Sequence, residues 1–206
     1  MRGPAPRPMS RRVLLALLGG ASLHIPWSPK VRASEPVRYS EGVAARIVSL
    51  DAVPSIPVVS MHGRSTRLDR ELDAAPVLLN FIFTTCSSTC SMQTAVLAEL
   101  QRLCIESGRP LRMVSITIDP DNDTPGQLRR FSGTFNIRPG WQFLTGRFDD
   151  LLQVQRHFDV YRGSKSAHPP VVLLRGSSKA PWTRIEGVAS ARDLLRALGS
   201  LAPAAA

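Results

Sequence analysis

The chain has 206 residues, of which 43% are hydrophobic and 20% are charged, and its formal net charge at pH 7 is +10. This length suits one domain with an N-terminal extension, and no run of about 20 apolar residues predicts a membrane-spanning helix. Six basic and no acidic residues lie in residues 1–33, so residues 34–206 carry 20 basic against 16 acidic residues. These charges are scattered, which argues against a nucleic-acid-binding protein.

Residues 1–33 have the organisation of an export signal. A basic stretch ending in Ser10-Arg11-Arg12 precedes an apolar run over residues 13–23, and Val31-Arg32-Ala33 has the small residues of a cleavage site. The paired arginines resemble a twin-arginine signal. The general secretory route and an uncleaved membrane anchor are the alternatives. Each of them predicts a domain in the periplasm or at the outer face of the inner membrane.

Residues 34–56 are predicted to form a linker, with at most a short strand, because prolines interrupt them and no period is sustained. From residue 57 the pattern changes to one of ordered elements. In chain order we expect a short hairpin over residues 58–68, a strand at 77–83, a helix at 91–107, a strand at 112–118, a helix at 125–135, a strand at 141–144, a helix at 148–158, strands at 171–174 and 182–187, and a helix at 190–201.

Continuous apolar runs and capping residues define these elements. Residues 77–83 form an uninterrupted run typical of a central buried strand. Asp123-Thr124-Pro125 supplies a capping residue with proline at the first helical position, and Ser190-Ala191-Arg192-Asp193 is a capping-box pattern. The alternation predicts an α/β domain over residues 57–201 with a thioredoxin-like outline, in which helices flank a central mixed sheet. Residues 202–206 are expected to be a frayed tail.

Cys86 and Cys90 lie in Thr84-Thr85-Cys86-Ser87-Ser88-Thr89-Cys90, where the buried strand passes into a helix. The N–H groups and the partial positive charge at a helix N-terminus stabilise a thiolate and lower its pKa. Thiolate is the form that attacks disulfides and binds metal ions. We therefore expect Cys86 and Cys90 to form a reactive or metal-binding site.

The spacing of the pair leaves three uses open. Cysteines at i and i+4 of a regular helix have Cβ atoms about 5–6 Å apart, whereas a disulfide needs about 3.5–4.5 Å. Two thiolates about 2.3 Å from one metal ion can stand further apart than two bonded sulfurs, which favours a metal site. A non-helical turn at Cys86 would permit a redox-active disulfide, and a purely structural pair is the third interpretation.

The remaining cysteine and the histidines are interpreted individually. Cys104 shares a helical face with apolar residues, so we expect it in the core, and the alternative is an odd thiol that pairs with another chain. His24, His62 and His157 are interpreted as surface or core residues. His168 differs from them because it immediately precedes an expected strand.

Three segments together resemble the SCO/SenC family over about residues 57–198. They are Phe83-Thr84-Thr85-Cys86-Ser87-Ser88-Thr89-Cys90, Ile116-Thr117-Ile118-Asp119-Pro120-Asp121-Asn122-Asp123-Thr124-Pro125, and the isolated His168 before an apolar strand. Members of this family are thioredoxin-like proteins, exported or membrane-anchored, which assist assembly of the dinuclear copper centre of cytochrome c oxidase.

The resemblance implies a copper site and its ligands. Carried over to this chain, Cys86 and Cys90 would be thiolate ligands and also the redox-active pair, and His168 would be the imidazole ligand. Soft sulfur holds Cu(I), and imidazole also accommodates Cu(II). The chain departs from the usual family pattern at Ser87, where a proline is common, and at the residues on either side of His168.

The implied function is that of a copper-delivering assembly factor, with the copper-bearing oxidase subunit and other copper chaperones as partners. Two alternatives stay open: a thiol-disulfide reductase that keeps oxidase-subunit cysteines reduced, which would make the chain an enzyme, and a copper or redox sensor. Nucleic acid is not an expected partner, and a membrane would be contacted only through an uncleaved N-terminal anchor.

Two aspartates lie near the expected site in sequence. Asp119 ends a buried strand, and we expect it to tune the site or to contact a partner. Asp123 is expected to be a capping or first-turn carboxylate of the helix that follows.

Overall fold

The computed structural model describes residues 3, 39–73, 76–109 and 111–201. The predicted export signal, the start of the predicted linker and the predicted tail at 202–206 lie outside the described residues. None of the helices formed by the described residues combines the length and the hydrophobicity that a bilayer span requires.

The strands and helices alternate as predicted, and each predicted element is present to within two residues at either end. The strands are β1 (Ala44–Val48), β2 (Pro57–Ser60), β3 (Ser65–Arg67), β4 (Val77–Ile82), β5 (Arg112–Thr117), β6 (Trp141–Thr145), β7 (Val171–Arg175) and β8 (Trp182–Glu186). The helices are α1 (Leu68–Leu72), α2 (Thr89–Glu106), α3 (Pro125–Gly133), α4 (Phe148–His157) and α5 (Ala191–Ser200), with a 3₁₀ turn η1 (Lys165–Ala167). Helix α1 and turn η1 were not predicted.

The described strands form one mixed sheet in the order β1-β8-β7-β4-β5-β6-β2-β3. Strands β4, β5 and β6 are parallel, whereas β7 and β8 form an antiparallel hairpin beside β4. All six residues of β4 are buried, as expected for a strand with neighbours on both sides and helices on both faces. The predicted thioredoxin-like fold is thus confirmed.

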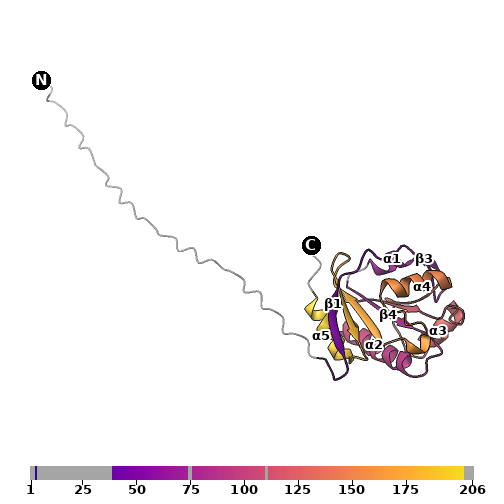
Figure 1. The fold of residues 1–206 in the computed structure, drawn as a ribbon. Coiled ribbons are helices and arrows are strands. Elements are labelled where there is room, and N and C mark those ends of the chain that lie inside the picture. Colours follow the sequence, from indigo (N-terminus) through magenta and orange to yellow (C-terminus); the bar gives the residue numbers. More distant parts are fainter. Residues whose placement is uncertain (1–2, 4–38, 74–75, 110, 202–206) are drawn as a thin grey trace. The chain divides into compact units, whose positions relative to one another are not determined.

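Helices cover both faces of this sheet (Figure 1). Helices α1 and α4 pack on one face in a layer that includes Leu79 and Phe81 of β4. Helices α2, α3 and α5 pack on the other face against Leu78 and Ile82. Successive side chains of a strand point to opposite faces, so one continuous apolar run supplies both layers.

Side chains cap two of the described helices, α5 and α3, at the two places where the sequence patterns indicated a cap. Ser190 Oγ accepts a hydrogen bond from the Asp193 backbone N–H at 3.1 Å, which caps α5. In α3 the cap is Thr124, whose Oγ1 accepts from the Gln127 N–H at 3.3 Å ahead of Pro125. Asp123 is therefore not the capping residue, and its carboxylate has a different use at the site.

The segment predicted as a linker contributes to the sheet, because β1 pairs with β8 along its whole length. The side chains of β1 are largely exposed, so they show no periodicity, and backbone pairing holds the strand. Gly187 makes the approach possible: it has φ of +93°, and a Cβ there would lie 2.6 Å from the Gly42 carbonyl oxygen. The ordered domain therefore begins before the predicted boundary at residue 57.

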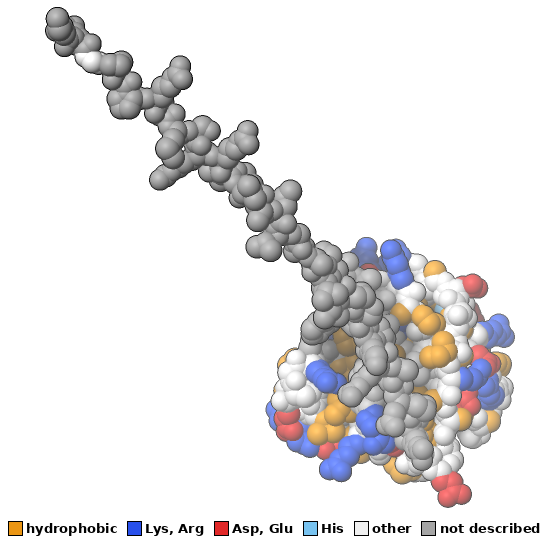
Figure 2. Space-filling view, turned by 90° about the vertical axis from the view of Figure 1, so that its left-hand side faces the viewer, with side chains coloured by type: hydrophobic (Ala, Val, Ile, Leu, Met, Phe, Trp, Pro, Cys, Tyr) orange, Lys and Arg blue, Asp and Glu red, His pale blue; other side chains and the backbone are white. Residues whose placement is uncertain are grey.

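Charged side chains on the β1 side of the domain are interspersed with other types. Figure 2 shows Lys and Arg around the rim of this face, with acidic and apolar side chains between them.

Candidate thiol and metal site

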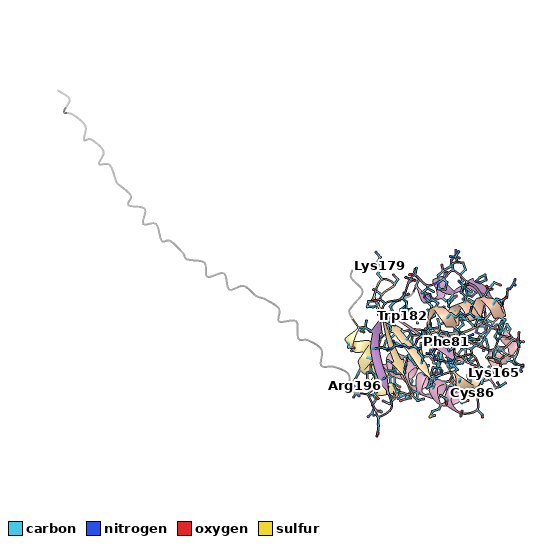
Figure 3. The ribbon with its side chains drawn as sticks, in the orientation of Figure 1. Phe81, Cys86, Lys165, Lys179, Trp182 and Arg196 are labelled. Carbon is cyan, nitrogen blue, oxygen red and sulfur yellow. The ribbon has the colours of Figure 1, made fainter. Side chains whose placement is uncertain are left out.

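Cys86 and Cys90 lie at the carboxyl end of the central strand β4, where the chain turns into α2. Cys86 precedes the helix, and Cys90 is its second residue. Loops from parallel strands meet at this edge of a sheet, which is where α/β proteins commonly bind ligands. Figure 3 shows Cys86 at the same end of the domain as Lys165, and both residues line one cavity.

Backbone and hydroxyl groups of the first turn of α2 contact Cys86. The Cys90 backbone N–H donates to Cys86 Sγ with an N···S distance of 3.4 Å, and Ser88 Oγ lies 3.8 Å from the same sulfur. All three cysteines of the chain are free thiols. Because Cys86 lies outside the regular helix, the spacing argument that favoured a metal over a disulfide does not apply, and both uses stay open.

The two thiols have different acidities. Partial burial would raise the pKa of Cys86, but hydrogen bonds from the Cys90 and Ser88 backbone N–H groups outweigh it and leave the pKa below its usual value. Burial raises the pKa of Cys90 to about 12, and the neighbouring Cys86 adds to the effect. Cys86 is thus the more acidic and the more accessible of the two thiols, and Cys90 is buried at 5% exposed.

His168 lies between η1 and strand β7, which runs antiparallel to β4. Its ring is 6.2 Å from that of Phe81, edge to face. Both ring nitrogens are buried and neither makes a well-formed hydrogen bond among the described residues, although the backbone carbonyls of Phe81 and Val160 lie near enough to favour the protonated ring. Burial lowers the pKa of His168, so the imidazole is neutral near pH 7 and can offer a lone pair to a ligand.

The three predicted ligands meet at one cavity of about 300 Å³. Cys86, Cys90 and His168 all line it, together with Gln93 and Lys165. Among the residues with described positions, however, no three Cys, His, Asp or Glu side chains stand close enough to hold one metal ion. The structure thus brings the three residues to a common space, and the ligand set stays a prediction.

The donor types fit a soft transition metal. Two thiolates and a neutral imidazole match the ligands that copper prefers, and the unpartnered ring nitrogens of His168 are available for coordination. A buried polar atom without a partner costs free energy, so its retention at a cavity is consistent with a bound group.

Asp119 contacts the segment that carries His168 rather than the cysteines. Its Oδ2 accepts from Lys165 Nζ at 2.6 Å, and Asn122 Nδ2 donates to its carboxylate at 3.0 Å. The Lys165 ammonium also lies 5.9 Å from the centre of the Phe83 ring. Asp119 therefore links the end of β5 to η1, and whether it tunes the site stays a prediction.

Asp123 is the residue that the sequence analysis misassigned. Its side chain is fully buried and accepts from the Thr84 backbone N–H at 3.1 Å and from the hydroxyls of Thr84 and Thr117. These bonds fix the turn that leads to Cys86. The Asp-Pro-x-x-Asp spacing shows that Asp123 follows β5, but its partner lies 39 residues earlier in the chain and cannot be read from that motif.

The other predicted core and surface residues lie away from this cavity. Cys104 is 2% exposed and packs in the layer beneath α2 and α5. His62 is exposed, and His157 is half-buried with its ring against Phe158. These placements agree with the predictions, and His24 is outside the described residues.

The chain matches a known family over most of the described domain. The family model described as SCO1/SenC matches residues 58–202. The SCO1 protein homolog of Bacillus subtilis (strain 168) is 37% identical over 88 residues, which are 42% of this chain and 45% of that relative. The chain spans about half the length of the curated relatives that it matches, 45% and 56% of two of them.

Solved structures share the fold. BsSco, a member of the Sco family of cytochrome c oxidase assembly proteins in which a disulfide switch was identified, aligns with a TM-score of 0.64 at 23% identity, covering 73% of this chain and 93% of that chain. Yeast Sco1 with copper bound aligns with a TM-score of 0.60 at 20% identity, covering 73% and 96%. At these identities the likeness shows the architecture alone.

Proposed function

This chain belongs to the SCO1/SenC family, and from that premise we propose that it binds copper through Cys86, Cys90 and His168 and delivers it to a cytochrome c oxidase. The observation that carries the proposal is that these three residues, which come from two distant segments, line one cavity. The Sco family is described as one of cytochrome c oxidase assembly proteins, and three of its members have been solved with copper bound.

Delivery requires that copper be exchangeable, and the site has one accessible ligand. Cys86 is partly exposed at the mouth of the cavity, whereas Cys90 is buried. An incoming thiolate of an acceptor can displace an exposed thiolate ligand more readily than a buried one. We therefore assign ligand exchange to Cys86, and retention of copper until transfer to Cys90 and His168.

The partners and location follow from the same proposal. The acceptor would be the copper-bearing subunit of the oxidase, with another copper chaperone as donor, in the periplasm or at the outer face of the inner membrane. The basic and apolar segments at the start of the chain support export.

Anaerobic copper titration tests the assignment. Reduced protein is titrated with Cu(I) against a chromophoric Cu(I) chelator. We expect one copper per chain, loss of binding in Cys86→Ser and Cys90→Ser, and at least about tenfold weaker binding in His168→Ala. His62→Ala, which removes an exposed histidine outside the cavity, is the matched control and should bind like the wild type. Equal binding by His168→Ala would refute the ligand set.

The asymmetry of the two thiols favours a second candidate function, thiol-disulfide exchange. The Cys86 thiolate would attack one sulfur of a target disulfide, forming a mixed disulfide and releasing the other target sulfur as a thiolate. Cys90, after losing its proton, would attack Cys86 Sγ, releasing the second target thiolate and leaving a Cys86–Cys90 disulfide. The target is reduced by two electrons, and the pair is oxidised by two.

Trapping distinguishes the two functions. In Cys90→Ser the mixed disulfide cannot be resolved, so a reductase would accumulate as a covalent complex that mass spectrometry detects. Reductase activity should survive in His168→Ala, whereas its affinity for Cu(I) should fall at least about tenfold. Activity lost equally in His168→Ala would argue against a separate reductase function.

A further inference from the structure

Gln93 lines the same cavity as the two cysteines and His168. Its side chain is 3% exposed, and its amide Nε2 has no hydrogen-bond partner among the described residues. A buried N–H group that has left water without gaining an acceptor destabilises the fold. Packing alone therefore does not explain why a glutamine, with an unpaired amide, occupies position 93.

A second glutamine on the same helix shows what an ordinary buried glutamine does. Gln101, at 4% exposed, donates from Nε2 to the Arg138 carbonyl at 2.9 Å, and its Oε1 accepts from the Arg138 backbone N–H at 2.8 Å. It closes the loop that leads into β6. Gln93 and Gln101 are thus almost equally buried on one helix, but only the Gln101 side-chain N–H has a hydrogen-bond acceptor among the described residues.

The acceptor missing for Gln93 is best supplied by a thiolate. Cys90 and Gln93 are three residues apart on α2, so their side chains are neighbours on one helix face. In the free-thiol protein the Gln93 amide makes no hydrogen bond to the Cys90 sulfur, which as a neutral thiol would be a weak acceptor. A thiolate is a strong one, because hydrogen bonds to charged acceptors are shorter and stronger than those between neutral groups.

We propose that Gln93 is a positioning residue of the metal site, whose side-chain amide donates a hydrogen bond to the Cys90 sulfur when that sulfur binds copper as a thiolate. This inference rests on the proposed function and adds a residue to it. Partners of metal ligands orient them and set the affinity, typically by 10–100-fold. Gln93 would act on copper through Cys90 without touching the metal.

The proposal predicts opposite behaviour in the copper-free and copper-bound protein. Without copper, Gln93 carries an unpaired buried donor, so an apolar residue of similar size should fold at least as well. With copper, the same change removes a hydrogen bond from a ligand. A residue with a merely structural role would be needed in both states.

Gln93→Leu and the matched control Gln101→Leu test this on the full chain. Three quantities are measured for each variant: the Tm of the reduced copper-free protein, the Cu(I) affinity by chelator competition, and the sulfur-to-copper charge-transfer absorption of the Cu(II) form. For Gln93→Leu we expect an unchanged or higher Tm, a Cu(I) affinity about tenfold weaker, and a shifted absorption band. For Gln101→Leu we expect a Tm lower by about 4 °C or more, with unchanged affinity and absorption.

The outcomes separate the two proposals. If the wild type binds copper while Gln93→Leu keeps both the wild-type affinity and the wild-type absorption band, the inference is overturned and the proposed function stands. If Gln93→Leu lowers the Tm of the copper-free protein as Gln101→Leu does, Gln93 is structural and the inference fails. If the wild type binds no copper, both proposals fail together.

Discussion

Helix α2 carries the same two residue types near each end: Cys90 and Gln93 near its amino terminus, and Gln101 and Cys104 near its carboxyl terminus. All four side chains are buried. Gln101 is hydrogen-bonded through both of its amide atoms, and Cys104 packs among apolar residues. At the other end, the Gln93 amide lacks a partner among the described residues, and Cys90 lines a cavity of about 300 Å³.

The position of each end relative to the sheet explains the difference. The amino-terminal end of α2 starts where β4 stops, so loops rather than strands surround it and leave a cavity. The carboxyl-terminal half packs its apolar residues on the face of the sheet, and Gln101 and Cys104 also line a cavity of about 370 Å³ near the loop that leads into β6. Both ends of α2 thus line a cavity, and they differ in that the Gln101 amide has hydrogen-bond partners whereas the Gln93 amide N–H has none among the described residues.

Thiol reactivity provides the largest expected contrast between the two ends. In reduced, copper-free protein at pH 8, iodoacetamide should modify Cys86 about a thousand times faster than Cys90, and it should modify Cys104 more slowly than Cys86 as well. Only thiolate reacts, and Cys90 and Cys104 are buried with raised pKa values. The rate at Cys86 should level off at a lower pH than that of an ordinary thiol, because its pKa is lowered, whereas the rate at Cys90 should still rise toward pH 12.

Timed alkylation followed by peptide mass spectrometry measures these rates. Modification in the presence of denaturant, where all three thiols are exposed, is the control and should equalise them. Labelling of Cys104 as fast as Cys86 in the folded protein would contradict the assignment of Cys104 to the core.

A smaller but still large effect is expected from loosening the turn at the amino-terminal end. Asp123→Ala removes the acceptor for the Thr84 N–H and for two threonine hydroxyls in a fully buried position. The free energy of unfolding, measured by urea denaturation, should fall by about 2–4 kcal/mol, and alkylation of Cys90 should accelerate.

Asp119→Ala is the matched control, four residues earlier in the same motif. It breaks an ion pair with Lys165, a side chain that is 46% exposed, so we expect a loss of about 0–1 kcal/mol. Equal losses in the two variants would mean that Asp123 does not hold the turn in the way that its contacts indicate.

The smallest expected effect is at the carboxyl-terminal end. Cys104→Ala removes one buried sulfur from a packed apolar layer and should lower the free energy of unfolding by about 1 kcal/mol. Copper binding should be unchanged, which competition titration can check. A loss of copper in this variant would show that the two ends are coupled.

Much of the fold could be predicted because its signals are local. The continuous apolar run of β4, the helical period of α2 and the Ser190 cap are each carried by neighbouring residues, and each element appears where expected. Strand β1 was predicted only as a possible short strand within a linker, because its exposed side chains show no hydrophobic period. It forms a strand by pairing with β8, which lies about 140 residues later in the chain.

At the site, the sequence by itself determined that Cys86 and Cys90 stand where a buried strand meets a helix, since both elements are encoded next to the pair. Only the tertiary structure decided the rest. In the folded protein His168 lines the same cavity as the two cysteines, and the Asp123 carboxylate accepts a hydrogen bond from Thr84 instead of capping α3. The Gln93 side-chain amide has no hydrogen-bond partner among the described residues. These contacts depend on which distant segments pack together, and the spacing of residues within one segment does not predict long-range packing.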